Sequence, residues 1–415
     1  MDRQTLAIYK RGAVVVLPVL AIVGCRVGLR ACVAVNQADR HRQIDDTRAR
    51  QAEEQRKAEL AAAQAESEAA QRVRTRRLPS VAHDTKTVPI ASGQQVPDAL
   101  AVDAQYVAWL ATRSGDVVVA PRSAGTGGAP KIVAKNQQLP QRRHVQGLAL
   151  GGGYVYWITT ASKDEPADGK IMRVRLGPDG DTGGAEPEAV GGAIAGLSAI
   201  ALDKGSVYYA RSLPERRNEA GEPTGGVYRL ELGPKGSNVV KSDRLVLPAE
   251  APCAFAVDDT NVYAVEEQKL WRVGKKTGAP KAIVSGADRL ACTVAVDAEN
   301  VYWTIPADDS VMRAKKTDGS GVGVVAFTRK RPTNIVVDQG YAYVLAETSP
   351  QALGELGSIF KVALRSDRLT PQALVTDQVG LGSVAALGGY VVFSGYNEAE
   401  NDGTVVAIPA EDVAR

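Results

Sequence analysis

The feature that most limits the fold of this chain is a unit of two short strands that recurs through most of its length. Each unit is an apolar stretch that ends in Asp or Gly, a turn, and a second stretch rich in Val, Tyr and Trp. Seven copies follow one another at intervals of about 39 to 55 residues: ALAVDAQYVAWLA, GLALGGGYVYWIT, AIALDKGSVYYAR, AFAVDDTNVYAVE, TVAVDAENVYWTI, NIVVDQGYAYVLA and VAALGGYVVFSG.

A third strand follows every copy, as in DSVMRAKK, and a fourth follows the first six, as in PKAIVSG. The seventh copy lacks a fourth strand, and KTVPIASG at Lys86 matches it. A period of this length with four strands per copy is typical of propeller blades, and a borrowed strand would close the ring. We therefore predict an all-β, seven-bladed β-propeller over residues 79–415, closed by a strand over 86–92. Six or eight blades fit the repeats less well.

The repeat pattern resembles that of uncharacterised exported bacterial β-propellers with AVD…VYW signatures and, more distantly, that of TolB-like propellers. The resemblance covers roughly residues 86–415. It implies the fold and says almost nothing about activity, because propellers serve in binding, in scaffolding and in several unrelated chemistries.

The N-terminal segment, residues 1–35, has the order of an export signal, with basic residues ahead of the apolar run AVVVLPVLAIVG. Ile22–Cys25 resembles the lipobox of bacterial lipoproteins, which makes Cys25 a candidate for lipid attachment. Apolar character resumes after Arg26, so an uncleaved signal-anchor transmembrane helix over roughly 13–35 is the alternative. Both predict membrane attachment in the cell envelope, with the propeller in the periplasm or outside the cell.

Residues 36–78 have a different composition, rich in Ala, Glu, Gln and Arg and free of Gly and Pro. These are strong helix formers, and no heptad of Leu or Ile runs through them. We predict a solvated, charged helical spacer between the membrane segment and the propeller.

Charge is uneven along the chain and limits the partners to be expected. Residues 1–78 hold 15 Lys and Arg against 9 Asp and Glu, whereas the remainder holds 35 against 38. Phosphate binding needs a concentrated basic face, so a mildly acidic body argues against nucleic acid as a partner. We expect a monomeric propeller.

Residue types that often perform chemistry are present but isolated. The three histidines stand apart, no metal-ligand spacing occurs, and we assign no catalytic residue, metal or cofactor. The turn aspartates are interpreted as caps of their own backbone, and the aromatic residues of the second strands as core. These residues are Asp103, Asp203, Asp258, Asp297 and Asp338, with Trp109, Trp157, Tyr209, Trp303 and Phe393.

Two cysteines occupy one position of adjacent repeats. Cys253 and Cys292 each lie five residues before a turn aspartate, which places them at the start of two neighbouring inner strands. In an oxidising compartment a disulfide between them is a candidate, and two buried free thiols are the alternative.

The loops give the remaining functional signal. Connections from a fourth strand to the next first strand emerge on the same side as the long, acidic connections between second and third strands. The former contain the candidate ligand-binding residues Arg142, Arg143, His144, Arg289, Arg329, Lys330 and Arg331. Long loops on a rigid ring often hold function. The sequence thus predicts a module that recognises a protein or an anionic glycan. The alternatives are a lyase or hydrolase with its site at the channel mouth and an envelope-assembly scaffold.

Overall fold

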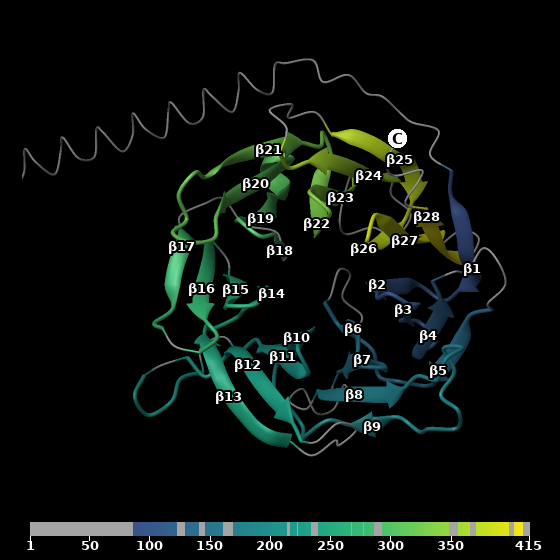
Figure 1. The fold of residues 1–415 in the computed structure, drawn as a ribbon, viewed down its shortest axis with the longest axis horizontal. Helices are drawn as coiled ribbons and strands as arrows, with labels where there is room; N and C mark the ends of the chain where they lie inside the picture. Colours follow the sequence, from purple (N-terminus) through teal and green to yellow (C-terminus); the bar gives the residue numbers. More distant parts are fainter. Residues whose placement is uncertain are drawn as a thin grey trace, which may run out of the picture. The chain divides into compact units, whose positions relative to one another are not determined.

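Seven four-stranded antiparallel sheets form the part of the chain that is described, arranged as blades around a central axis (Figure 1). The computed structural model describes residues 86–409, except 123–128, 141–145, 161–168, 214–215, 222, 234–239, 267, 277, 286–292, 348–355, 366–370 and 398–401. The predicted all-β, seven-bladed propeller is confirmed. The predicted membrane segment and helical spacer lie outside the described residues, and no described helix is long and apolar enough to cross a membrane.

The blades are numbered in chain order, and their strands are given from the channel outward. Blade one is β2 (Pro97–Val102), β3 (Tyr106–Ala111), β4 (Asp116–Pro121) and β5 (Lys131–Ala134). Blade two is β6 (Leu148–Gly151), β7 (Tyr154–Thr159), β8 (Lys170–Arg175) and β9 (Glu188–Ala189). Blade three is β10 (Leu197–Asp203), β11 (Ser206–Arg211), β12 (Gly226–Leu232) and β13 (Val240–Pro248). Blade four is β14 (Ala254–Val257), β15 (Asn261–Glu266), β16 (Lys269–Gly274) and β17 (Lys281–Ser285).

Blade five is β18 (Val294–Val296), β19 (Asn300–Ile305), β20 (Ser310–Lys315) and β21 (Gly323–Phe327), with the 3-10 turn η1 (Pro306–Asp308) after β19. Blade six is β22 (Arg331–Asp338), β23 (Tyr341–Glu347), β24 (Leu356–Ala363) and β25 (Gln372–Val379). Blade seven is β26 (Leu381–Leu387), β27 (Tyr390–Asn397), β28 (Asp402–Ile408) and, outermost, β1 (Val88–Gln94).

Blade seven therefore combines the two ends of the repeat region. β1 pairs antiparallel with β28, from Val88 opposite Ala407 to Gln94 opposite Gly403. Ile90 and Ala91 of β1 are buried in the same apolar cluster as residues of blades one and seven. The first and last blades are thereby held by the same sheet hydrogen bonds that hold every other blade.

Turns between first and second strands are of two kinds. Asp103, Asp258 and Asp297 each accept hydrogen bonds from backbone N–H groups two and three residues ahead, which is the predicted capping role. Blades two, three, six and seven use two-residue turns whose second residue is Gly at positive φ, which suits a hairpin whose strands twist to the right.

The other two turn aspartates differ from the capping interpretation. The carboxylate of Asp203 bonds the ammonium of Lys275, and Asp338 accepts the N–H of Gly389, in both cases from the following blade. In the two-residue turns of blades three and six, no backbone N–H group of the turn bonds these carboxylates. They bond groups of the neighbouring blade instead.

The core lies between blades rather than within one layer. Seven apolar clusters occur, and each joins residues of two adjacent sheets. Trp109, Trp157 and Trp303 are at most 1% exposed within them. The second-strand aromatic residues are thus core, as predicted, and every seam between blades buries apolar surface.

Inner strands are also linked to one another around the channel. Ile200 N donates to the carbonyl of Gln146 at 2.8 Å, and Ile335 N donates to Thr293 Oγ1 at 3.2 Å. Leu100 N donates to Ser383 Oγ at 3.3 Å, across the junction of blades seven and one. An inner strand has no sheet neighbour on its channel side, so these bonds satisfy backbone donors that the ladder leaves free.

The tight pairing of β1 with β28 predicts that one added methyl group at Gly403 lowers the stability of the propeller. A Cβ on Gly403 would lie 2.4 Å from both the carbonyl oxygen of Gln94 and Cδ of Pro97, so Gly403→Ala must push β1 away from β28. We expect a loss of about 1–3 kcal/mol in the free energy of unfolding, measured by urea denaturation.

Gly192→Ala is the control, because a Cβ there meets nothing within 4 Å. Equal stabilities of the two variants would show that the pairing of β1 with β28 does not limit stability.

Candidate functional site

The antiparallel order of strands gives the ring two chemically different faces. Connections from second to third strands and from a fourth strand to the next blade emerge on one, here called the loop face. Connections between first and second and between third and fourth strands form the other, the turn face. All seven predicted ligand-binding residues are expected on the loop face.

Three of those seven residues can be located. Arg142, Arg143, His144 and Arg289 lie outside the described residues, as do Cys25 and Cys292. Arg329, Lys330 and Arg331 join β21 to β22, and both arginines are exposed.

The connection that contains these three cations is well anchored. Thr328 donates through its N–H and its hydroxyl to the carbonyl of Asp309 in the preceding turn. Lys330 Nζ donates to Ser358 Oγ at 3.1 Å, and Arg329 adopts a φ of 59°. Arg331 begins β22, and its guanidinium forms no ion pair with any described residue. Of the three, Arg331 is thus the side chain most available to a ligand.

The central channel contains a cavity of about 430 Å³, lined by the inner strands of all seven blades. Most lining side chains are small and aliphatic, and the polar ones are Gln146, Thr293, Asn334 and Ser383. No described side chain of this wall is an acid, a base or a thiol, so the wall itself lacks a general acid–base pair.

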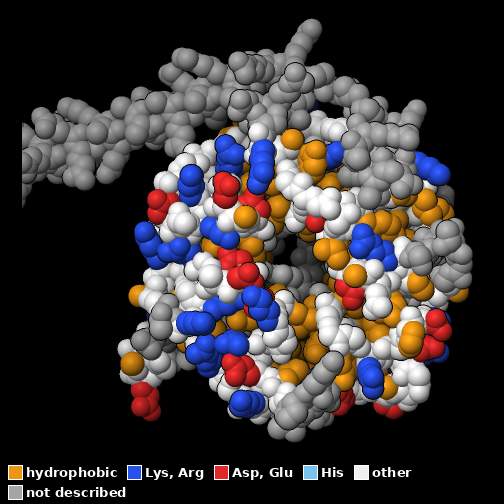
Figure 2. Space-filling view, in the orientation of Figure 1, with side chains coloured by type: hydrophobic (Ala, Val, Ile, Leu, Met, Phe, Trp, Pro, Cys, Tyr) orange, Lys and Arg blue, Asp and Glu red, His pale blue; other side chains and the backbone are white. Residues whose placement is uncertain are grey.

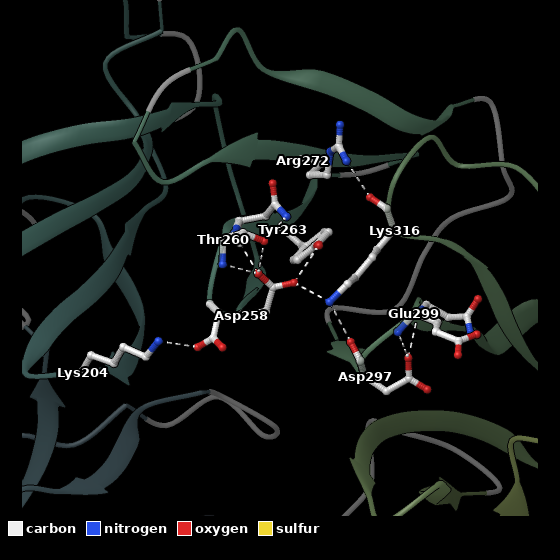
Figure 3. A network of polar contacts seen from close by, with 11 residues as sticks. Lys204, Asp258, Thr260, Tyr263, Arg272, Asp297, Glu299 and Lys316 are labelled. Carbon is white, nitrogen blue, oxygen red and sulfur yellow. Dashed lines mark hydrogen bonds and ion pairs between the residues drawn. The ribbon is translucent and has the colours of Figure 1, made fainter.

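A network of ionisable groups lies on the turn face, at the seam between blades four and five (Figure 3). Lys316 of blade five donates to Asp258 Oδ2 of blade four at 2.8 Å and to the carbonyl of Asp297 at 2.9 Å. Tyr263 donates to the same carboxylate at 2.9 Å, and Arg272 donates to the carbonyl of Lys316 at 2.9 Å. Two blades are thereby joined by five polar groups.

The same positions are used at other seams. Lys275 corresponds to Lys316 in the repeat and bonds Asp203 of the preceding blade. Arg122 also occupies this position and donates to the carbonyl of Leu387. Arg313 corresponds to Arg272 and donates to the carbonyl of Leu364 in the next blade. Sequence reasoning missed this network, although the recurrence of a cation at the end of the third strand, in APR, VGK and AKK, was a visible signal.

The pKa values in this network follow from its contacts. Burial raises the pKa of Asp258, but the hydrogen bonds from Lys316, Thr260, Asn261 and Tyr263 outweigh burial and hold the pKa well below its usual range. Burial, and then the bond to Asp297, raises the pKa of Tyr302. These shifts belong to an ionised carboxylate held by a cation and a neutral phenol, which is a structural arrangement.

Lys and Arg side chains gather over blades three to five in the orientation of Figure 2, beside acidic side chains near the central opening. The ion pairs of this sector explain the mixture: Lys275 with Asp203, Lys316 with Asp258, and Lys204 with Asp259 at 2.7 Å. Since the paired cations are neutralised, the sector is less basic than its number of lysines suggests.

Cys253 is disulfide-bonded. It lies directly before β14, where its side chain packs against the cluster between blades four and five. Its predicted partner, Cys292, lies outside the described residues, so the pairing stays a prediction.

No group of His, Cys, Asp and Glu able to hold a metal ion occurs within the described residues.

No protein-family model matches the chain, and no curated protein is similar to it in sequence. Solved structures show its fold. The WD40 propeller domain of Doa1 aligns with a TM-score of 0.53 at 11% identity, covering 79% of this chain and 99% of that one. The Neurospora crassa Pan2 WD40 domain aligns with a TM-score of 0.51 at 9% identity, covering 80% and 98%. At such identity the likeness concerns the β-propeller fold alone.

The seam network predicts a specific dependence of stability on acid. Because the folded-state pKa of Asp258 is lowered, its contribution is complete above the unfolded value near 3.8 and is lost as pH falls below it. Asp258→Asn should cost about 1–3 kcal/mol at neutral pH and make stability below pH 4 fall less steeply than in the wild type, measured by urea denaturation at several pH values.

The control is Asp259→Asn, whose carboxylate is 78% exposed and should matter little. Parallel pH profiles of wild type and Asp258→Asn would contradict the proposed role of this carboxylate.

The disulfide predicts a redox-dependent stability. Cys253→Ser should lower the free energy of unfolding by about 2–4 kcal/mol. A reducing agent should lower the wild type to the same level and leave Cys253→Ser and Cys292→Ser unchanged. A reductant-sensitive Cys292→Ser variant would show that Cys253 pairs with another cysteine.

Proposed function

We propose that this chain is a membrane-anchored, extracytoplasmic recognition module that binds a negatively charged partner, a protein or an anionic glycan, on the loop face of its propeller. The observation on which the proposal rests is the exposed cationic edge at the start of β22, where Arg331 has no ion-pair partner among the described residues.

Charge on the loop face supports a partner of negative sign. The sequence predicts Arg142, Arg143, His144 and Arg289, which lie outside the described residues, in connections of the same class as Arg329–Arg331, and the proposal takes the arginine charges to converge on one side of the ring. Such convergence attracts anions and speeds their association. The described connection at Arg329–Arg331 is held between two sheet strands, which limits the conformational entropy that binding there would cost.

Recognition is favoured over turnover by the position of the ionisable groups. Asp258, Tyr263 and Tyr302, whose pKa values are shifted, are all engaged in bonds on the turn face. The described channel wall offers neither an acid nor a base. A lyase or hydrolase site at the channel mouth therefore gains no support from the described residues.

Attachment to the membrane is supported by the sequence of residues 1–35, and export from the cytoplasm is supported by the disulfide at Cys253. Basic residues ahead of an apolar run direct export, and stable disulfides form in oxidising compartments. Lipid on Cys25 and a signal-anchor helix are the two means of attachment that this segment allows.

The test uses the full-length chain, with the double variant Arg329→Ala/Arg331→Ala. Binding to an envelope extract and to immobilised sulfated and carboxylated polysaccharides should weaken about tenfold or more, because two exposed cations are removed, and should fall with added salt.

The matched control is Lys276→Ala/Lys315→Ala, which removes the same charge from exposed positions of the turn face. Equal binding by the two double variants would refute a binding surface at Arg329–Arg331.

A further inference from the structure

The channel wall has a chemistry of its own that the charged edge does not explain. Its side chains are aliphatic or uncharged polar, and its surface also includes the channel-side edges of seven inner strands. Such an edge presents backbone N–H and C=O groups that no sheet neighbour covers. The wall is thus a mixture of small apolar patches and hydrogen-bonding groups without charge.

The polar side chains of the wall lie at its loop-face end. Thr293, Asn334 and Ser383 occupy one position of the repeat, and Gln146 occupies the position before it, near the loop-face end of the inner strands. Together they form an uncharged polar ring at the mouth of the channel, here called the mouth ring.

All four members of the mouth ring have unused hydrogen-bonding capacity. Gln146 reaches past blade three, where its Oε1 accepts the N–H of Phe255 at 3.4 Å, and its amide NH₂ bonds no described residue. The side-chain amide of Asn334 likewise bonds no described residue and is only partly buried. The hydroxyls of Thr293 and Ser383 accept from neighbouring backbone, and each keeps its own proton for a further acceptor.

This wall discriminates between classes of ligand. A charged group would lose its hydration and find no opposite charge. A hydrocarbon chain would cover backbone groups and leave them without partners. A ligand with many hydroxyls satisfies the wall, because a hydroxyl both donates and accepts and the C–H faces of a sugar ring pack against Ala, Val and Leu.

We propose that the channel mouth binds one or two neutral sugar residues of a glycan, with Gln146 and Asn334 as the residues that determine specificity. The cavity of about 430 Å³ lies within the range of small-ligand sites, roughly 300–1,000 Å³. The inference deepens the proposed function, on which it rests for the loop face as the side of entry, and it identifies the ligand as a glycan.

The probes are the neutral disaccharides maltose, cellobiose, lactose and diacetylchitobiose, tested by saturation-transfer-difference NMR and calorimetry. The full-length chain is kept in a zwitterionic detergent without a sugar head group, so that the detergent cannot compete. We expect at least one disaccharide to bind, and Asn334→Leu and Gln146→Met each to weaken that binding at least fivefold, as for a lost hydrogen bond to a buried group.

Gln105→Met is the matched control, since it removes an exposed amide from a turn-face hairpin. Thermal denaturation of each variant identifies any loss of folding, and the two mouth-ring variants serve as independent tests. Absence of binding by all four disaccharides, or binding that neither variant changes, would overturn the inference.

The two proposals fail in different ways. If disaccharide binding is lost only in Arg329→Ala/Arg331→Ala, sugar binds at the charged edge and the channel inference is wrong. If the mouth-ring variants lose disaccharide binding while the arginine variant still binds anionic polysaccharides normally, the channel site stands and the anionic surface does not.

Discussion

The pairing of β1 with β28 is the contact on which the ring depends. An open array of blades would leave one face of its first blade and one face of its last in water, with Trp109 and Val392 exposed. Because β1 completes blade seven from the other end of the repeat region, the seventh apolar cluster forms and every blade is covered on both faces. The tight approach of Gly403 to Gln94 shows that this junction is packed as closely as a core.

Closure of the ring fixes how the seven blades are arranged. The seams between blades are then stabilised by two kinds of interaction, apolar clusters and polar bonds on the turn face. The apolar clusters supply non-directional stabilisation proportional to buried area. On the turn face, Lys316 and Asp258 add bonds whose geometry fixes how one blade is placed against the next. Side chains that satisfy one another in this way have little capacity left for ligands, which agrees with the proposal that recognition takes place on the opposite face.

Local patterns of the repeat allowed the fold to be predicted, whereas contacts between repeats were not accessible. Strands such as NVYWTI are recognised by their content of β-branched and aromatic residues. The extra strand at Lys86 follows from counting the strands of each repeat, because the seventh repeat lacks its fourth. The partner of Lys316 could not be predicted in this way, because Asp258 lies 58 residues away and contacts Lys316 only after two blades pack together. A separation of 72 residues likewise explains Asp203, whose role depends on Lys275 of the next blade rather than on its own turn.

The proposed channel site shows most clearly why composition alone was not enough to indicate it. Gln146, Thr293, Asn334 and Ser383 are unremarkable polar residues dispersed over 238 positions of sequence, and only the ring brings them to one mouth. Charged residues are prominent in a sequence, but a charged group in an uncharged channel would lose its hydration and find no opposite charge. A site for a neutral ligand in a propeller is therefore expected to be inconspicuous in sequence, and its chemistry is defined only when seven inner strands stand side by side.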